Sequence, residues 1–386
     1  MAITLAKLCA TAEKTYHMKL LAGGAGMHNY VRWVHMIEDM KVPSFLHGDE
    51  LVFTTGIGQS GTAWLLEFVR LLYESRGAGL VVNLGPYIRA VPPQVIVFCE
   101  QHGLPLFQVP WEIHLIDITY DFCHRIVANE ENEMSLANAF RDLIFATQEL
   151  PRLRPTLERH GFADADSYCA AVFSVACGGA PASDQQRRTL RFLAHRLFGR
   201  LGCRFTLFYQ EERLVAVVDG LAPKGLQAVA ENFIRMCAGQ DPPAQVFAGI
   251  GPQENGFASI PGSFCKASAA LRLARRQQRP CLHYQALGVY KILLAVENPA
   301  LLRDVSEETL GRLKAFDEKN GTDYVQTLRS YIEHDSSVQA LSRISGVHRN
   351  TINYKVKRIR QILQCELTQE EKLRALLAFY IDDLLE

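Results

Sequence analysis

Residues 336–363 constrain the fold of this chain more than any other stretch of its sequence. They read SSVQALSRISGVHRNTINYKVKRIRQIL, which divides into two short helices around a tight turn at residues 345–347. Gly346 can take the positive φ that so sharp a reversal demands, while small serines beside it let the two helices approach closely. The residues expected to bury between the helices are Leu341, Ile344 and Val347. The pattern predicts a helix-turn-helix at about residues 337–363.

The second predicted helix has one apolar side and one polar side. Its apolar residues Ile352, Val356, Ile359 and Leu363 recur at steps of four, three and four, which places them on one inward face. Arg and Asn on the opposite face can each make two hydrogen bonds to a purine edge, and the early positions of a recognition helix point at the bases. The candidate DNA-contacting residues are therefore His348, Arg349, Asn350, Thr351, Asn353, Tyr354, Lys357 and Arg358.

Charge along the chain is balanced overall but uneven locally. Lys plus Arg (41) equals Asp plus Glu (41), so the whole molecule has no net charge that would attract a polyanion. Between Asp335 and Cys365, however, the sequence has six basic residues and one acidic residue, Asp335 itself. This local excess favours contact with DNA phosphates. The alternative is a solvated charged helix in an ordinary bundle, as in an adaptor that binds proteins and not DNA.

The run VHRNTINYKVKRI is similar to the HRNT-containing helix-turn-helix at the C-terminus of the PucR family of bacterial regulators. The N-terminal runs VRWVHMIEDMKVPSFLHGDELVFTTGIG and GLPLFQVPWEI resemble the opening domain of that family. VFAGIG, SFCKASAALRLAR and LHYQALGVYKILL resemble its degenerate GGDEF-like domain. The pieces occur in the expected order and cover nearly the whole chain. Gly346 departs from the pattern, since the family often has a bulky apolar residue there.

The resemblance implies a ligand-responsive, sequence-specific transcription regulator of a catabolic operon, often for purines or other nitrogen compounds, and often an activator. Its expected partners are double-stranded operator DNA, a small-molecule effector and RNA polymerase. We expect a homodimer or higher homo-oligomer, in which the effector changes the spacing of paired recognition helices on DNA. We expect no enzymatic activity, no cofactor and no metal.

Runs of strand and helix patterns predict an α/β domain, an α+β ferredoxin-like or palm-like domain and an all-helical domain. The predicted boundaries are 1–125 for an effector-sensing domain, 126–155 for a helical linker, 156–298 for the GGDEF-like domain and 299–386 for the DNA-binding domain. The linker helix could pair with a second copy or pack against its own domain, and Pro151 and Pro155 are expected to end it. The last helix, Gln369–Leu385, is expected to present Leu373, Leu376, Leu377 and Tyr380 to the core.

A candidate effector pocket lies where a strand ends in Thr54, Thr55 and Gly56 and leads into a helix. Free N–H groups and two hydroxyls at such a turn suit a small anionic or amide-rich molecule. Arg32, His35 and Glu38, on or after the preceding strand, are candidate neighbours. The alternative is that all six are turn and surface residues with structural roles only.

Two enzymatic interpretations compete with the regulator. Gly56-x-Gly58-x-x-Gly61 matches the glycine spacing of an NAD(P)-dependent oxidoreductase. Such a site also needs an acidic residue about 20 residues after the glycines, at the end of the next strand, to bind the ribose, but that strand ends in Asn83. A GGDEF cyclase would need glycines and acids at its hairpin to hold nucleotide and metal. The hairpin here, residues 209–213, reads YQEER and has no glycine, and CGG follows the strand at residues 170–176 where an aspartate is expected.

The sequence also predicts a cytoplasmic protein. No N-terminal signal segment and no run of about 18 apolar residues occurs, so neither secretion nor membrane insertion is expected. The ten cysteines form no C-x-x-C pair and are interpreted as reduced core residues.

Overall fold

The computed structural model describes residues 3–39, 46–240, 243–296 and 298–385. The chain falls into two compact units. One comprises residues 1–142, 151–161 and 188–201, and the other residues 143–150, 162–187 and 202–386. Residues 40–45, which are part of the N-terminal run that resembles the family, lie outside the described residues. The boundaries expected from the sequence at 125, 155 and 298 remain predictions.

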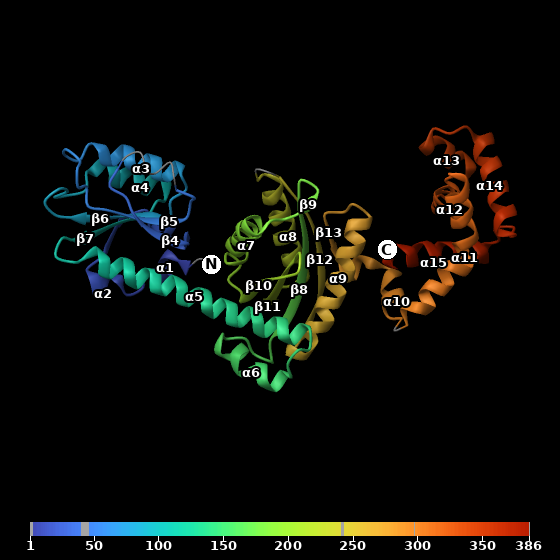
Figure 1. The fold of residues 1–386 in the computed structure, drawn as a ribbon, viewed down its shortest axis with the longest axis horizontal. Helices are drawn as coiled ribbons and strands as arrows, with labels where there is room; N and C mark the ends of the chain where they lie inside the picture. The colour runs from blue at the N-terminus through green and yellow to red at the C-terminus, as the bar shows by residue number, and fades with distance from the viewer. Residues whose placement is uncertain (1–2, 40–45, 241–242, 297, 386) are drawn as a thin grey trace. The chain divides into compact units, whose positions relative to one another are not determined.

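A five-stranded sheet forms the centre of the N-terminal part of the chain (Figure 1). Its strands lie in the order β2-β7-β6-β5-β4, with β4 to β7 parallel and β2 antiparallel to β7. They span β2 (Lys19–Ala22), β4 (Trp33–Met36), β5 (Glu50–Thr54), β6 (Gly79–Leu84) and β7 (Leu106–Pro110), and a separate ladder pairs β1 (Ile3–Thr4) with β3 (Tyr30–Val31). The α/β class and parallel pairing predicted for this part are confirmed.

Helices cover both faces of this sheet (Figure 1). On one side lie α3 (Trp64–Glu74) and α4 (Pro93–His102); on the other lie α1 (Leu5–Leu8), α2 (Ala12–Tyr16) and α5 (Leu115–Ile144). Successive side chains of a strand point to opposite faces, so Val52 packs in the core with Phe68 while Phe53 packs in the other core against Phe122. Burial on both faces explains the continuous apolar run at residues 51–53 of β5.

The long helix α5 has 30 residues, and its Ile118, Phe122 and Ile126 pack in the same core as Phe53. It does not continue to the two prolines that were expected to end it. It stops at Ile144, and Pro151 and Pro155 both lie in a separate helix, α6 (Leu150–Arg159). Pro151 is tolerated there because the first turn of a helix leaves its N–H groups unpaired in any case.

A second sheet has the order β10-β11-β8-β12-β13, antiparallel except for the parallel pair β12 and β13. Its elements are β8 (Ser167–Cys177), β9 (Ala180–Pro181, paired with β8), α7 (Asp184–Phe198), β10 (Phe205–Gln210), β11 (Arg213–Asp219), α8 (Pro223–Ala238), β12 (Ala244–Asn255), α9 (Ile260–Arg276) and β13 (Cys281–His283). The chain order from β8 to α9 is the strand and helix order predicted for a ferredoxin-like domain.

Helices α8 and α9 pack on opposite faces of the second sheet. Phe173 of β8 meets Phe233 of α8 with ring centroids 5.3 Å apart, whereas its neighbour Val172 packs with Ala267 of α9. The approach on the α9 side is close, because a Cβ at Gly249 of β12 would lie 2.1 Å from the Ala267 carbonyl oxygen. Only glycine fits at this position.

The remainder of the chain is helical. Its elements are α10 (Tyr290–Leu294), α11 (Pro299–Asn320), α12 (Tyr324–Glu333), α13 (Val338–Ser345), α14 (Arg349–Leu363) and α15 (Gln369–Leu385). Helices α11 and α15 lie side by side (Figure 1). Phe379 of α15 belongs to a core shared with α11 to α14, whereas Ile381 and Leu384 join a second core with Leu273 of α9.

This double packing changes which face of α15 is buried. Leu373 was predicted to face the core but is 66% exposed, and Leu376, Leu377 and Tyr380 are half-buried. The buried residues are Ala375, Ala378, Phe379, Ile381, Asp383 and Leu384. Since the helix passes from one set of neighbours to another, no single apolar stripe describes its contacts.

Among the described residues, no helix is both long enough and apolar enough to cross a bilayer. The cysteines are unpaired, and burial raises the thiol pKa of Cys99, Cys169, Cys237 and Cys281 to about 12. Cys265 is exposed, contrary to its interpretation as a core residue.

Candidate nucleic-acid interface

The turn between α13 and α14 is built from local hydrogen bonds. Gly346 has φ 68°, and its N–H donates to the Ser342 carbonyl oxygen at 3.1 Å, which ends α13. The Ser342 hydroxyl donates to the Val347 carbonyl oxygen, and the Ser345 hydroxyl to the Leu341 carbonyl oxygen, both at 2.7 Å. His348 then caps α14, because its Nδ1 accepts from the N–H of Asn350 at 3.3 Å. The serines thus satisfy backbone groups that the sharp turn leaves without helical partners.

The inward face of α14 matches the predicted stripe. Ile352, Val356 and Ile359 are buried in the same core as Leu341 of α13. Leu363 and Val347 are half-buried at the edge of this core. The prediction that Ile344 is buried between the helices is wrong, because this side chain is 65% exposed.

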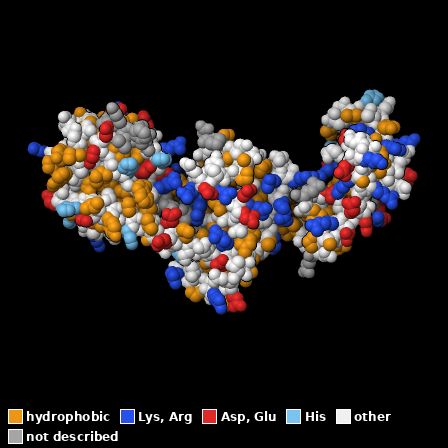
Figure 2. All heavy atoms as spheres, in the orientation of Figure 1, with side chains coloured by type: hydrophobic (Ala, Val, Ile, Leu, Met, Phe, Trp, Pro, Cys, Tyr) orange, Lys and Arg blue, Asp and Glu red, His pale blue; other side chains and the backbone are white. Residues whose placement is uncertain are grey.

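The outward face of α14 is open to solvent. The side chains predicted to contact DNA are all exposed: His348, Arg349, Asn350, Thr351, Asn353, Tyr354, Lys357 and Arg358. Figure 2 shows Lys and Arg side chains on the visible surface of these C-terminal helices. A helix that buries one stripe and exposes an opposite polar stripe can enter a major groove without rearrangement.

The basic residues of this region have different electrostatic surroundings. Lys355 is neutralised by Asp323, since its Nζ lies 2.6 Å from both carboxylate oxygens. The Arg358 guanidinium lies 5.7 Å from the Phe316 ring centroid, so its stem runs back over the protein. Within the described part of the chain, Arg349 and Lys357 pair with no carboxylate. Arg343 and Arg358 likewise form no ion pair among the described residues, so a carboxylate neutralises none of these four charges.

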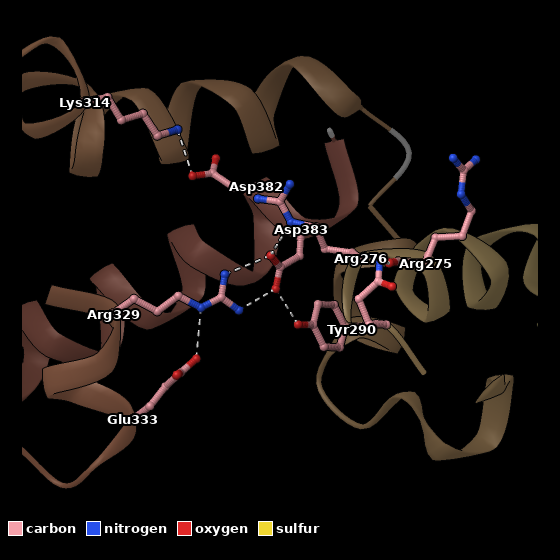
Figure 3. Close-up of polar contacts among 9 residues, drawn as sticks. Arg275, Arg276, Tyr290, Lys314, Arg329, Glu333, Asp382 and Asp383 are labelled. Atoms are coloured by element: carbon pink, nitrogen blue, oxygen red, sulfur yellow. Dashed lines mark hydrogen bonds and ion pairs between the residues drawn. The ribbon is translucent and has the colours of Figure 1, made fainter. Parts of the chain in front are cut away.

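A charged cluster holds α12 and α15 together behind this interface (Figure 3). Arg329 of α12 donates to both oxygens of Asp383, whose side chain is only 1% exposed, and the Tyr290 hydroxyl donates to Asp383 at 2.8 Å. The Arg276 Nε of α9 lies 3.5 Å from the same carboxylate. Burial opposes ionisation, but the hydrogen bonds from Arg329 and Tyr290 hold the pKa of Asp383 below its ordinary value. This cluster was not predicted, because its members lie far apart in sequence.

The candidate effector residues are only partly brought together. Glu38 accepts from the Thr54 hydroxyl at 3.0 Å, from the N–H and hydroxyl of Thr55 at 2.8 Å each, and from the Gly56 N–H at 2.9 Å. The donors that were expected to hold an anion are therefore taken by a carboxylate of the chain itself. Arg32 and His35 make no hydrogen bond to this cluster among the described residues; Arg32 is half-buried and His35 is exposed on the edge strand β4.

The same turn lacks the geometry of a dinucleotide site. Gly56, Gly58 and Gly61 all have positive φ, at 75°, 78° and 68°, but α3 begins only at Trp64. A Cβ at Gly58 or Gly61 would meet nothing within 4 Å, so these glycines serve the loop conformation and no close packing. A dinucleotide fingerprint instead uses its glycines to bring the backbone and the helix N-terminus onto a pyrophosphate.

Three family models match the chain in order. They are the purine catabolism regulatory protein-like family at residues 8–126, the GGDEF-like domain at 147–273 and the PucR C-terminal helix-turn-helix domain at 324–381. The third range contains α12 to α14 and every predicted DNA-contacting residue.

Among curated proteins of Bacillus subtilis (strain 168), the chain is 25% identical over 183 residues to the proline-responsive transcriptional activator PutR. That match covers 45% of this chain and 44% of PutR. The chain is 28% identical over 116 residues to the DNA-binding transcriptional activator AdeR, covering 29% of this chain and 28% of AdeR. It is 29% identical over 119 residues to the purine catabolism regulatory protein, covering 31% and 22%. The chain thus spans less than half the length of each of these relatives.

Two solved structures are similar at low identity. A regulator of polyketide synthase expression from Bifidobacterium adolescentis is 18% identical, with a TM-score of 0.31, over 63% of this chain and 95% of that chain. The GGDEF domain of DgcB from Caulobacter crescentus is 15% identical, with a TM-score of 0.26, over 35% of this chain and 85% of that chain.

Proposed function

We propose, from the premise that this chain belongs to the PucR family, that it is a sequence-specific DNA-binding regulator of transcription that responds to a small molecule. The observation that carries the proposal is the two-sided character of α14, with one stripe buried and the opposite, cationic stripe exposed. Double-stranded operator DNA is the partner that this face suits.

Each part of the exposed face has a distinct proposed role. Arg349, Asn350 and Asn353 stand in the first turns of α14, where a recognition helix meets base edges. Lys357, one turn further on, would contact a phosphate, and Arg358, whose guanidinium lies over the Phe316 ring, would contact the backbone beside it. His348 contributes as the residue that begins the helix.

The remaining functions follow from the relatives. Two relatives, PutR and AdeR, are named as transcriptional activators, the first of them as proline-responsive, and a third is named for purine catabolism. We therefore propose that this chain activates a catabolic operon for a nitrogen compound, with RNA polymerase as a further partner. We propose a cytoplasmic homodimer or higher homo-oligomer, since paired recognition helices read paired half-sites. We propose no enzymatic activity, because the hairpin between β10 and β11 turns through Glu211 and Glu212 and carries no glycine that would admit a nucleotide.

The proposed effector site is the cluster around Glu38, with Arg32 and His35 as more distant neighbours. Because Glu38 already accepts four hydrogen bonds from Thr54, Thr55 and Gly56, an anionic effector would have to displace it. An effector with amide or amino donors could instead bind the carboxylate. Thermal shift of the full chain with L-proline and with hypoxanthine, repeated on Thr55→Ala, tests this site: an unchanged ligand-induced shift in the variant removes Thr55 from it.

DNA binding is tested by mobility-shift titration on a duplex selected from DNA bound in cells and on a scrambled duplex. Arg349→Ala and Asn353→Ala should each cost about 1–3 kcal/mol on the selected duplex and less on the scrambled one. Lys357→Ala should weaken binding to both alike. Arg374→Ala, an exposed arginine of α15 paired with Glu370, is the matched control and should change neither.

Two results would count against the proposal. Equal losses on both duplexes for Arg349→Ala would argue against base contacts. The absence of salt-dependent DNA affinity would favour an adaptor that binds proteins only. An absorbance spectrum of the pure protein tests the oxidoreductase alternative, because a bound nucleotide would be visible in it.

A further inference from the structure

A pocket of about 670 Å³ lies beside α9 on the face of the second sheet that this helix covers. Its sheet side is formed by Gln210 of β10 and by Arg213 and Val215 of β11. Val215 pairs across the sheet with Val172, which packs beneath α9, so these side chains share one face. The volume lies within the range of about 300–1,000 Å³ of small-molecule sites.

Helix α9 presents a regular stripe to this pocket. Gly262, Cys265, Lys266, Ala269 and Arg272 stand at positions i, i+3, i+4, i+7 and i+10, which places them on one side of the helix.

Two arginines of the pocket lack a countercharge. Within the described residues, no carboxylate lies within ion-pair distance of Arg213 or Arg272, whereas Lys266 is held 2.5 Å from Glu254. The two guanidinium groups also repel each other, since partial desolvation and the charge of Arg213 lower the pKa of Arg272, whose side chain is still exposed to solvent. Glu211 also lines the pocket but lies within ion-pair distance of neither arginine among the described residues. Two like charges left unpaired in this way are stabilised when an anion binds between them.

A buried hydroxyl supplies an independent observation. Ser268 is only 7% exposed, and its Oγ has no hydrogen-bond partner among the described residues. An unpaired buried hydroxyl costs free energy that a ligand accepting or donating a hydrogen bond would recover. Ser268 lines the same pocket as the two arginines.

The remaining walls are apolar or aromatic. Phe264 meets Phe145 edge to face with ring centroids 5.4 Å apart, and Tyr284 and Leu294 close the side formed by the segments after α9. Such walls favour a ligand with an apolar body in addition to its charge.

We propose that this pocket is a second ligand site, separate from the cluster around Glu38, and that it binds a small organic anion whose charged group lies between Arg213 and Arg272 and whose apolar body lies against Phe264 and Tyr284. The Ser268 hydroxyl would hydrogen-bond to the same ligand. The site does not depend on DNA binding by α14, so it can fail or succeed independently of the proposed function.

Isothermal titration of the full chain with phenyl phosphate and with benzoate tests the proposal, with benzyl alcohol as the uncharged comparison. We expect saturable binding of at least one anion and none of the alcohol. Arg213→Gln and Arg272→Gln should each weaken that binding roughly tenfold or more, since each removes a charge-assisted hydrogen bond. Arg275→Gln, an exposed α9 residue outside the pocket, is the matched control and should bind as the unchanged protein does.

Two further measurements guard against loss of folding. Ser268→Ala should weaken anion binding while leaving the melting temperature without ligand unchanged or higher, because it removes an unpaired buried hydroxyl. Bound anion should also slow alkylation of Cys265, which is exposed and lines the pocket. The proposal is overturned if neither anion binds saturably, or if binding is unaffected by both arginine substitutions.

Discussion

Arg329 and Asp383 form a two-point ion pair, in which Nη1 and Nη2 lie 2.9 and 2.7 Å from the two carboxylate oxygens. The residues are 54 positions apart in the sequence and connect α12, next to the helix-turn-helix, with the end of α15. Because Tyr290 of α10 donates to the same carboxylate, one buried charge joins α12 and α15 to the segment that follows the second sheet.

Replacing Asp383 with Asn should destabilise this helical region by about 3–5 kcal/mol, because it leaves the partly buried Arg329 without its countercharge. Hydrogen-exchange mass spectrometry of α12 and α15 would measure the loss of protection. Glu370→Gln, which breaks the exposed pair with Arg374, is the comparison and should cost less than about 1 kcal/mol. Similar protection in both variants would mean that the buried pair does not hold the helices together.

The same carboxylate should make the region sensitive to acid. The pKa of Asp383 is lower in the folded protein than in the unfolded chain, so its stabilisation is present above the unfolded pKa of about 3.9. It is lost as the pH falls through the lower, folded value. Acid titration followed by exchange in α15 should therefore show a loss of stability below about pH 4 that Asp383→Asn does not show.

Gly346→Ala should reduce the stability of the helix-turn-helix by about 1 kcal/mol. A Cβ there would meet nothing within 4 Å, so the expected cost comes only from holding alanine at φ 68°. Urea unfolding monitored by circular dichroism gives the size of the effect. A much larger loss would indicate that a side chain at this position clashes with the neighbouring helix.

Glu38→Ala should destabilise the N-terminal sheet by about 1–3 kcal/mol, because the N–H groups of Thr55 and Gly56 lose their acceptor. The exposed Glu67, which lies 3.7 Å from Arg70, offers a matched Glu67→Ala control with an expected effect below about 1 kcal/mol. Exchange rates at the end of β5 would report the change, and equal effects in the two variants would argue that the Glu38 cluster is not structural.

Asp49→Asn should stabilise the protein at neutral pH. Burial raises the pKa of Asp49 to about 6, so ionisation is costly in the folded state and stability falls as the pH rises through that value. The variant should gain about 1–3 kcal/mol at pH 7.5 and little near pH 4, where the wild-type carboxyl is protonated. Urea midpoints at the two pH values test this, and a gain that is the same at both would exclude titration of Asp49 as its source.

The local features of this chain could be predicted from its sequence because they depend on neighbours in sequence. Glycine at position 346 and the stripe of Ile352, Val356 and Ile359 specify a turn and a two-sided helix, since a helix repeats every 3.6 residues wherever it lies. Alternating strand and helix patterns likewise predicted β4 to β7 of the first sheet and β8, β10, β11 and β12 of the second in the correct chain order, but not the edge strands β2 and β13.

Tertiary structure decided the features that join distant residues. Glu38 fills the Thr54–Gly56 turn across 16 to 18 positions, and Asp383 meets Tyr290 across 93, separations at which no periodic pattern operates. The exposure of Ile344 and Leu373 could not be predicted from the sequence either, because an apolar residue at helical spacing is buried only where another element covers it. The sequence by itself therefore determined which side of α14 is polar, and only the packing of α11 to α15 determined that this side is left open.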